Sequence, residues 1–310
     1  MSSNKQTKFA LLAPTAAAAA IVVVQFFALH SDTAAAQQRP ARPVAATGVA
    51  PSAIPVLAGS GTATKPLAPP ATCTAPAELA RFDRPLIHTM RHLANGQPLT
   101  IVAIGSSSTA GAGASSPAAT YPSRLAVELR ARFPGREITV LNRGVNGEET
   151  TNMMARFAAD VLAAHPQLVL WQIGTNSVLR DHPLSPHAVQ LHDGIERLKA
   201  AGVDVVLIDP QFAPAVLAKS ETPGMVEQIA LAAKTEDVGL FHRFAVMRDW
   251  REVQHLSFDT FVSPDHLHMN DWSYACLAKL LGGAIAEAAT RPIAAAAMHP
   301  DTVSAKPDVH

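Results

Sequence analysis

The sequence has 310 residues and equal numbers of basic and acidic residues, 25 Lys+Arg and 25 Asp+Glu. The first 75 residues hold five of the basic residues and one of the acidic residues, which leaves 20 basic and 24 acidic residues in the remainder. This balance excludes the basic surface with which a nucleic-acid-binding protein follows a phosphate backbone. The two cysteines, Cys73 and Cys276, are too few for a disulfide-dense scaffold or a cysteine-built zinc site.

The N-terminal segment, residues 1–36, has the pattern of a targeting signal. Lys5 and Lys8 precede an uncharged run at residues 9–29, and the small residues 34–36 match the site that a signal peptidase cleaves. The run is also long enough, at roughly 30 Å as a helix, for an uncleaved signal anchor. Both interpretations predict export to the periplasm or the extracellular space, with a membrane anchor if the signal is retained.

Composition divides the rest of the chain into a linker, a folded domain and a tail. Residues 37–75 are rich in Pro, Ala, Gly and Thr without helical or strand periodicity, which is typical of a disordered linker. Residues 76–290 show periodic patterns and are long enough to bury a sizeable core. Arg291 and Pro292 end the last periodic helix, so we expect a disordered tail over residues 291–310.

Within residues 76–290, short runs rich in β-branched residues alternate with helical patterns. The expected strands span residues 99–104, 138–142, 168–173, 203–208 and 238–241. The expected helices span residues 121–133, 151–164, 186–201, 225–235 and 270–288. This alternation predicts an α/β fold with a parallel sheet of about five strands, covered by helices on both faces. Because such sheets bind ligands beyond the carboxyl ends of their strands, functional residues should follow the strands.

The loop after the first expected strand, residues 105–113, is rich in Gly and Ser. It lacks the Gly-Lys pair of a phosphate-binding loop and the third glycine of a dinucleotide-binding turn, so nucleotide binding is poorly supported. Ser107 also falls outside the Gly-x-Ser-x-Gly pattern of α/β-hydrolases, because Thr109 stands at the second glycine. By itself, a serine cluster at this place is typical of an ordinary loop.

The next two strand ends carry residues that suit an oxyanion site. Gly144 and Gly147 follow the second strand, and glycines let backbone N–H groups point into a cleft. Asn176 follows the third strand, where its side-chain amide could act as a further donor. Each feature alone is equally compatible with an ordinary turn.

The segment before the last expected helix contains a carboxylate and an imidazole three residues apart. Asp265 can reach the Nδ1–H group of His268, which fixes the tautomer and leaves Nε2 free to act as a base. Asn270 or Asp271 is a suitable N-cap for the helix that follows, and this helix would hold the loop. His266 and His268 together could instead suggest a metal site, but no third ligand stands at a recognisable spacing.

These four segments, in this order, resemble the four blocks of the SGNH hydrolases, the superfamily that contains the GDSL esterases and lipases. The matching residues are 105–109, 142–147, 174–176 and 265–268. Residues 104–116 and 267–274 also resemble a bacterial exported subgroup of this superfamily. The resemblance implies a flavodoxin-like three-layer α/β/α sandwich with Ser107 as nucleophile, Asp265 as orienting acid and His268 as base.

The resemblance also implies that the oxyanion is bound by the N–H groups of Ser107 and Gly147 and by the amide of Asn176. Gly147 is preferred over Gly144 because the functional glycine of the family precedes an acidic residue, and Glu148 fills that place. No metal and no cofactor are implied.

Two positions depart from the family pattern. The family usually has Asp before its serine and Asp after its asparagine, whereas this sequence has Ser106 and Ser177. Neither position takes part in the proton transfer. We expect the substitutions to remove two acceptors that could brace the loops of the site.

The resemblance implies serine-dependent hydrolysis of carboxylic esters, and export favours small acyl groups such as acetyl on envelope or extracellular glycans as the substrate. An acyltransferase that passes the acyl group to a sugar hydroxyl with the same triad is one alternative. A catalytically silent module that binds glycans is another. No long apolar lid segment lies between the blocks, which disfavours a lipase.

The two cysteines are placed to join the start of the domain to its last helix. Cys73 lies just before the expected domain and Cys276 lies in the helix that follows His268. An oxidising compartment favours a disulfide between them. Two free thiols are the alternative.

Overall fold

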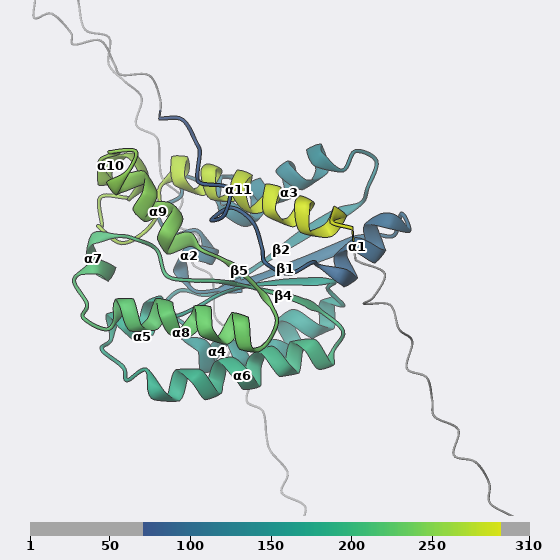
Figure 1. The fold of residues 1–310 in the computed structure, drawn as a ribbon, viewed down its shortest axis with the longest axis horizontal. Coiled ribbons are helices and arrows are strands. Elements are labelled where there is room, and N and C mark those ends of the chain that lie inside the picture. Colours follow the sequence, from purple (N-terminus) through teal and green to yellow (C-terminus); the bar gives the residue numbers. More distant parts are fainter. Residues whose placement is uncertain (1–70, 293–310) are drawn as a thin grey trace, which may run out of the picture. The chain divides into compact units, whose positions relative to one another are not determined.

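The computed structural model of the protein describes residues 71–292 (Figure 1). The expected signal segment at residues 1–36, the linker up to residue 70 and the tail from residue 293 lie outside the described residues. Within them, five parallel strands form one sheet in the order β2-β1-β3-β4-β5. The strands are β1 Leu99–Gly105, β2 Ile138–Gly144, β3 Leu168–Gln172, β4 Asp204–Ile208 and β5 Gly239–Phe241.

The strand order is that of doubly wound, flavodoxin-like sheets. Strands β1 and β2 pair over their whole length, from Leu99 opposite Ile138 to Gly105 opposite Gly144. The two strands therefore end level, and the loops that follow them start side by side. The predicted fold class and the five expected strands are confirmed.

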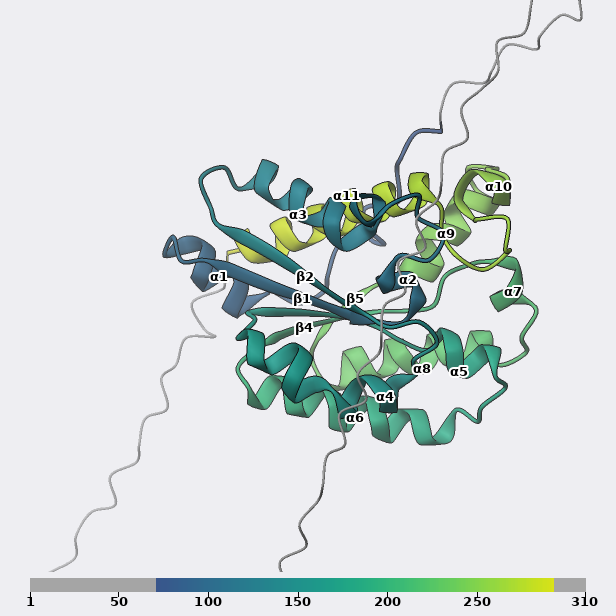
Figure 2. The ribbon, with the colours of Figure 1, turned by 180° about the vertical axis from the view of Figure 1, so that it is seen from behind.

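Helices cover both faces of this sheet (Figure 1 and Figure 2). The helices are α1 Ile87–Ala94, α2 Ser107–Ala110, α3 Tyr121–Arg132, α4 Thr150–Ala155, α5 Thr175–Leu179, α6 Ser185–Ala200, α7 Pro214–Leu217, α8 Thr222–Thr235, α9 Arg243–Glu252, α10 Phe258–Phe261 and α11 Asp271–Thr290. Helices α1, α3, α9 and α11 lie on one face of the sheet, and α4, α6 and α8 lie on the other. Of the helices formed by residues 71–292, none is both long and apolar enough to cross a membrane.

Alternating side chains of β1 divide the core into two layers. Leu99, Ile101 and Ala103 pack with residues of α3 and α11, whereas Val102 and Ile104 pack with residues of α4 and α6. All five side chains are buried. Because β1 is covered on both faces, its residues 101–104 appear in the sequence as a continuous apolar run.

One expected helix, at residues 151–164, is interrupted. Helix α4 is followed by a π-helical turn, Phe157–Val161, and a 3₁₀ turn, Leu162–Ala164. Between α4 and the first turn, Arg156 leaves the helical region with φ −105° and ψ 8°, and its guanidinium donates to the carbonyl oxygen of Arg143 at 2.7 Å. This contact with the end of β2 overrides the helical pattern of the sequence.

The periodicity of the sequence predicts neither α1 nor α9. In α9, the buried Val246, Met247 and Trp250 are surrounded by charged residues. Arg243, in the same helix, is itself buried and donates through Nε to the carbonyl oxygen of Asp209 at 2.8 Å. A buried arginine weakens the apolar stripe that indicates a helix in a sequence.

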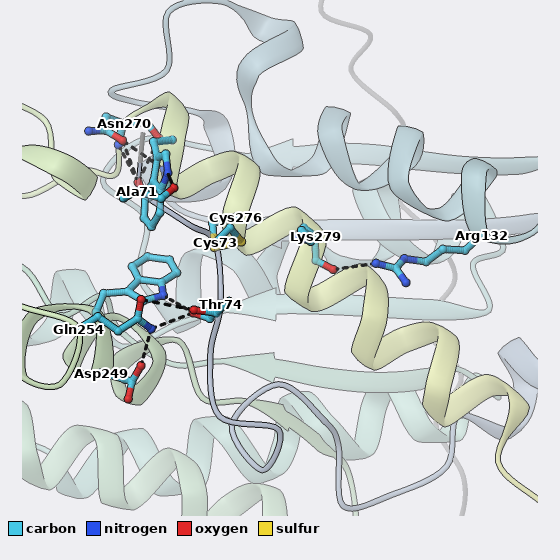
Figure 3. Close-up of a disulfide and its surroundings, with 12 residues drawn as sticks. Ala71, Cys73, Thr74, Arg132, Asp249, Gln254, Asn270, Cys276 and Lys279 are labelled. Atoms are coloured by element: carbon cyan, nitrogen blue, oxygen red, sulfur yellow. Dashed lines mark hydrogen bonds between the residues drawn. A yellow bond between two sulfur atoms is a disulfide. The ribbon is translucent and has the colours of Figure 1, made fainter. Parts of the chain in front are cut away.

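The expected disulfide between Cys73 and Cys276 is present, with the Cα atoms 5.4 Å apart (Figure 3). Cys276 is buried in α11, so the bond holds the residues before α1 against this helix. The predicted joining of the start of the domain to its last helix is thereby confirmed.

Two indole hydrogen bonds flank the disulfide. Trp272 Nε1 donates to the carbonyl oxygen of Ala71 at 3.0 Å, and Trp250 Nε1 donates to that of Thr74 at 2.9 Å. Residues 71–75, which composition assigns to the linker, are therefore attached to the domain by side chains of α9 and α11. The linker composition conceals this attachment, because the contacts are made by backbone carbonyl groups that any residue supplies.

Candidate active site

Four loops meet at the carboxyl end of the sheet. Helix α2 follows β1, residues 145–149 follow β2, α5 follows β3, and residues 263–269 precede α11. Figure 2 shows α2, α5 and α7 at the same end of the sheet. Parallel α/β sheets bind their ligands at this edge.

Ser107, His268 and Asp265 form a continuous hydrogen-bonded row. Ser107 is the first residue of α2 and is half-buried. His268 Nε2 lies 2.8 Å from Ser107 Oγ, although the two residues are 161 positions apart in the chain. Asp265 Oδ2 lies 2.5 Å from Nδ1 of the same ring. This is the arrangement of a Ser-His-Asp triad.

Asp265 sets both the position and the tautomer of His268. Its Oδ1 accepts the backbone N–H groups of Leu267 and His268, at 3.0 and 2.9 Å. An ionised carboxylate only accepts hydrogen bonds, so the ring proton lies on Nδ1 and Nε2 accepts the Ser107 hydroxyl. Burial raises the pKa of Asp265, but hydrogen bonds from His268 and Leu267 outweigh burial and lower this pKa from its ordinary value. The carboxylate therefore stays ionised beside the imidazole.

The three expected oxyanion donors come from three different loops. The N–H groups of Ser107 and Gly147 donate to no other group among residues 71–292. Asn176 Nδ2 donates one hydrogen to the carbonyl oxygen of Glu148 at 2.8 Å. An amide carries a second hydrogen, which is available to a substrate.

Gly144, the other glycine after β2, has a packing role. Its N–H donates to Asn142 Oδ1 at 2.9 Å, so it is not available to an oxyanion. A Cβ at this position would lie 2.0 Å from the backbone nitrogen of Ala110, so only glycine lets the end of β2 approach α2. Asn142 Nδ2 also donates to the carbonyl oxygen of Thr109 at 2.8 Å. The loops that follow β1 and β2 are thus held in direct contact.

Other residues brace the two positions at which the sequence departs from the SGNH pattern. Ser106 donates through N and Oγ to Gln172 Oε1, at 2.9 and 3.0 Å. Ser177 Oγ donates to Glu149 Oε2 at 2.8 Å. The two Asp acceptors of the family pattern are absent, and acceptors on β3 and on the loop after β2 brace these positions instead.

The four segments that resemble the SGNH blocks do not include Gln172, Glu149 or Gln211. Gln211 Oε1 accepts from Thr175 Oγ1 at 3.0 Å, and Gln211 Nε2 donates to the carbonyl oxygen of Leu267 at 3.3 Å. These bonds tie α5 to the loop before α11. A signal does exist for the two glutamines, because each is a buried amide at or just beyond the end of an apolar strand. Buried amides need partners, so such positions indicate a contact.

His266 has a backbone role in the loop before α11. Its φ of 60° lies in the left-handed region, and its carbonyl oxygen accepts from Ala215 N, in α7, at 3.0 Å. Within the described residues, no three or more His, Cys, Asp or Glu side chains are grouped so as to hold a metal ion.

Solved structures with a similar fold include esterases. One is a two-domain esterase active on acetylated mannans, with a TM-score of 0.58 and 19% sequence identity over 74% of this chain and 58% of that chain. Another is a variant of an acetylxylan esterase from Geobacillus stearothermophilus, with a TM-score of 0.52 and 19% identity over 60% of this chain and 94% of that chain. At these identities the likeness shows the shared fold.

Sequence comparison leads to one family. An arylesterase from Vibrio mimicus is 31% identical over 80 residues, which are 26% of this chain and 40% of the relative. The chain thus spans less than two thirds of this relative, as it does of the mannan esterase. The pattern of the Non-GDSL lipase-like family matches residues 72–291, nearly all of the described residues. The protein therefore belongs to the Non-GDSL lipase-like family, and its resemblance to the SGNH hydrolases is confirmed.

Proposed function

We propose that this protein is a serine-dependent hydrolase of carboxylic esters. The observation that carries the proposal is the hydrogen-bonded row from Asp265 through His268 to Ser107, with 2.8 Å between His268 Nε2 and Ser107 Oγ. A base this close to a hydroxyl can activate it as a nucleophile. The similarity to an arylesterase and to two polysaccharide acetyl esterases supports the same class of reaction.

The reaction has two acyl-transfer steps. His268 Nε2 takes the proton of Ser107 while Oγ attacks the ester carbonyl carbon. The resulting oxyanion accepts hydrogen bonds from the N–H groups of Ser107 and Gly147 and from the Asn176 amide. The imidazolium, stabilised by ionised Asp265, returns its proton to the departing alcohol. Water then repeats the sequence on the acyl-enzyme, with His268 as base, and releases the acid.

The proposed substrates are small acyl esters, and in particular acetyl groups on glycans. Two structures of similar fold belong to esterases of acetylated mannans and of acetylxylan, which supports this substrate class. Rates on p-nitrophenyl esters of increasing acyl length should be highest for acetate and fall with chain length. Release of acetate from acetylated mannan or xylan, with product analysis in the presence and absence of acceptor sugars, would separate hydrolysis from acyl transfer.

The decisive test of the mechanism is the pair of variants Ser107→Ala and His268→Ala. Each removes a member of one catalytic unit, so each should lower kcat by about a thousandfold or more. The double variant should be hardly less active than either single variant, because the two groups act together. A serine-directed phosphonate should label wild-type Ser107, and His268→Ala should suppress the labelling. A folded Ser107→Ala protein with wild-type esterase activity would refute the mechanism.

We also propose that the protein is exported, with cleavage of the segment at residues 1–36. The disulfide supports an oxidising compartment, because such bonds are rare in reducing ones. Intact-mass analysis of periplasmic or extracellular material should find a mature chain that begins near Gln37. Recovery of the full-length chain from the membrane fraction alone would replace cleavage with an anchor.

A further inference from the structure

Glu149 connects the loop after β2 to the helix after β3. Its Oε2 accepts from Ser177 Oγ at 2.8 Å, and its Oε1 accepts from Arg180 Nη1 at 2.6 Å. His182 Nδ1 lies 2.9 Å from Oε2. Ser177 lies in the middle of α5 and Arg180 is its C-cap, so a single carboxylate binds the middle and the C-terminal end of this helix.

The two segments that Glu149 connects are those with two of the oxyanion donors. Gly147 lies two residues before Glu149, and Asn176 lies in the first turn of α5. Two further hydrogen bonds join the same segments: Asn176 Nδ2 donates to the carbonyl oxygen of Glu148, and Arg180 Nη2 donates to that of Gly147, both at 2.8 Å. Gly147 has a φ of 77°, and glycine moves easily among such conformations. Its peptide therefore depends on outside contacts for its orientation.

The surroundings of Glu149 favour an ionised carboxylate. Burial raises the pKa of Glu149, but hydrogen bonds from His182, Ser177 and Arg180 outweigh burial and lower this pKa from its ordinary value. The Ser177 hydroxyl must then donate to the carboxylate. His187 Nε2, 2.9 Å from Ser177 Oγ, is consequently the donor to this hydroxyl. Burial lowers the pKa of the His187 ring, which favours its neutral form.

We propose that Glu149 is a positioning residue of the oxyanion site: its carboxylate holds the Gly147 loop and the Asn176 helix at the spacing at which both donors reach one oxyanion. The inference rests on the proposed esterase function. Glu149 acts through Arg180 and Ser177 rather than on the substrate. Oxyanion donors work only when they are held about 2.7–3.1 Å from the developing charge, so a small increase in the spacing of the two segments lowers the rate.

A purely structural role of Glu149 predicts a different result. Glu149 is also the N-cap residue of α4, in a capping box: its side chain accepts from the backbone N–H of Asn152, and its own N–H donates to Asn152 Oδ1 at 3.1 Å. Loss of this cap would lower the stability of the fold and leave the turnover of the folded protein unchanged. The Glu149 side chain shares in this cap, so the turnover of the folded protein, and not its stability, tests the role of the carboxylate in the oxyanion site.

The test is Glu149→Gln in the full chain, with p-nitrophenyl acetate as substrate. Glutamine keeps the size of the side chain and removes its charge. If its Oε1 faces Arg180, its NH₂ group faces Ser177 and His182, which must then change from donors to acceptors. We expect kcat to fall about tenfold or more and KM to change less than about twofold, because the weakened interaction is made to the transition state. Labelling by diethyl p-nitrophenyl phosphate should still reach one equivalent per chain, since Ser107 is unchanged.

Glu236 provides a matched control. Its side chain is 12% exposed, against 18% for Glu149, and it is also bound by a histidine and a cation, His192 and Lys199. Glu236 lies just before β5, at the amino end of the strands and away from the site. Glu236→Gln should leave kcat unchanged. Equal kcat values for Glu149→Gln and Glu236→Gln would overturn the proposal.

A second variant moves the carboxylate from position 149 to position 177, the two partners of the Ser177–Glu149 hydrogen bond. Ser177→Asp, added to Glu149→Gln, places a carboxylate three residues before Arg180 on the same helix, within reach of the guanidinium. We expect kcat to rise about threefold or more above that of Glu149→Gln alone. Loss of the α4 cap would not be reversed by a carboxylate at position 177. A kcat of the double variant no higher than that of Glu149→Gln would count against the carboxylate as the group that positions the oxyanion donors.

The same assay separates this inference from the proposed function. An active Ser107→Ala protein would refute the esterase mechanism, and with it the role of Glu149. An inactive Ser107→Ala protein together with a fully active Glu149→Gln protein would refute the role of Glu149 alone.

Discussion

One of the two amide hydrogens of Asn176 is used in a hydrogen bond within the protein, and the other is the proposed donor to the oxyanion. Nδ2 donates to the carbonyl oxygen of Glu148 at 2.8 Å, which prevents free rotation of the amide. Asn176→Ala should therefore lower kcat on p-nitrophenyl acetate about a hundredfold, or roughly 3 kcal/mol, because one oxyanion donor is lost while Ser107 and His268 remain.

Asn95→Ala is the control for this substitution. Asn95 ends α1, before the amino end of β1 and at the opposite edge of the sheet, and its replacement should not affect turnover. A kcat for Asn176→Ala within about threefold of the wild-type value would remove Asn176 from the oxyanion site.

Asp265 should show its role in the pH dependence of stability as well as in activity. Asp265→Ala should lower kcat less than His268→Ala does, because a poorly held imidazole still accepts a proton. The pKa of Asp265 in the folded protein is lower than its ordinary value of 3.8. Its ionised form therefore stabilises the fold above that pH, and this contribution disappears as the pH falls through the lowered pKa.

Urea unfolding at several pH values measures this contribution. The difference in free energy of unfolding between wild type and Asp265→Ala should be present at neutral pH and shrink as the pH falls below the ordinary Asp pKa of 3.8. A difference of the same size at neutral and acid pH would show that the charge of Asp265 is not the cause.

At the scale of elements, the loop after α2 packs tightly against the loop before α11. Gly113 has a φ of 86°, and a Cβ there would lie 2.3 Å from the carbonyl oxygen of Met269 and 3.1 Å from His268 Cβ. Gly113→Ala should push the two loops apart, which moves His268 away from Ser107. We expect a loss of about 1–3 kcal/mol in the free energy of unfolding together with a lower kcat.

Gly135 is the control for this substitution, because its φ is similar to that of Gly113 but its surroundings are open. Its φ is 78°, and a Cβ there would meet no heavy atom within 4 Å. Gly135→Ala should bring a similar backbone strain and leave kcat unchanged. If the two variants turned over substrate equally fast, the contact at Gly113 would have no part in placing His268.

The start of α11 shows how one helix supports the site. Of the two expected caps, Asn270 is the N-cap: its Oδ1 accepts from Ser273 N at 3.2 Å, and its N–H donates to Ser273 Oγ at 3.0 Å. The cap lies two residues after His268, so the beginning of the helix also ends the loop. Local spacing is sufficient to predict such a cap, because its partners are three residues apart.

At the scale of the whole molecule, the disulfide closes a loop with a sequence separation of 203 residues. Replacement of both cysteines, Cys73→Ser with Cys276→Ser, should lower the free energy of unfolding by at most about 4–5 kcal/mol, as chain-entropy arithmetic gives for long loops. Urea unfolding with and without reductant checks this. The wild type should respond to reductant and the double variant should not. Equal midpoints for oxidised and reduced wild type would contradict the predicted stabilisation.

Much of the fold is predictable because the relevant interactions are local. Strands and helices repeat their buried positions every two residues or every three to four, so α/β alternation is visible without any tertiary contact. The prediction of one continuous helix at residues 151–164 was wrong where this locality fails, because Arg156 also binds the carbonyl group of Arg143, which lies in β2. Helix α9 was missed for a related reason, since the buried Arg243 binds the carbonyl oxygen of Asp209, which lies just after β4.

The order of residues along the chain is enough to predict which side chains stand at the strand ends. It also predicts the contact between Asp265 and His268, which are only three residues apart. Which loops meet depends on the folded arrangement of the strands. The contact of Ser107 with His268 spans 161 positions, and the bracing of Ser177 by Glu149 spans 28. Spacing along the chain reports interactions within a few residues. These longer contacts depend instead on the order and register of the strands, which place separate loops at one edge of the sheet.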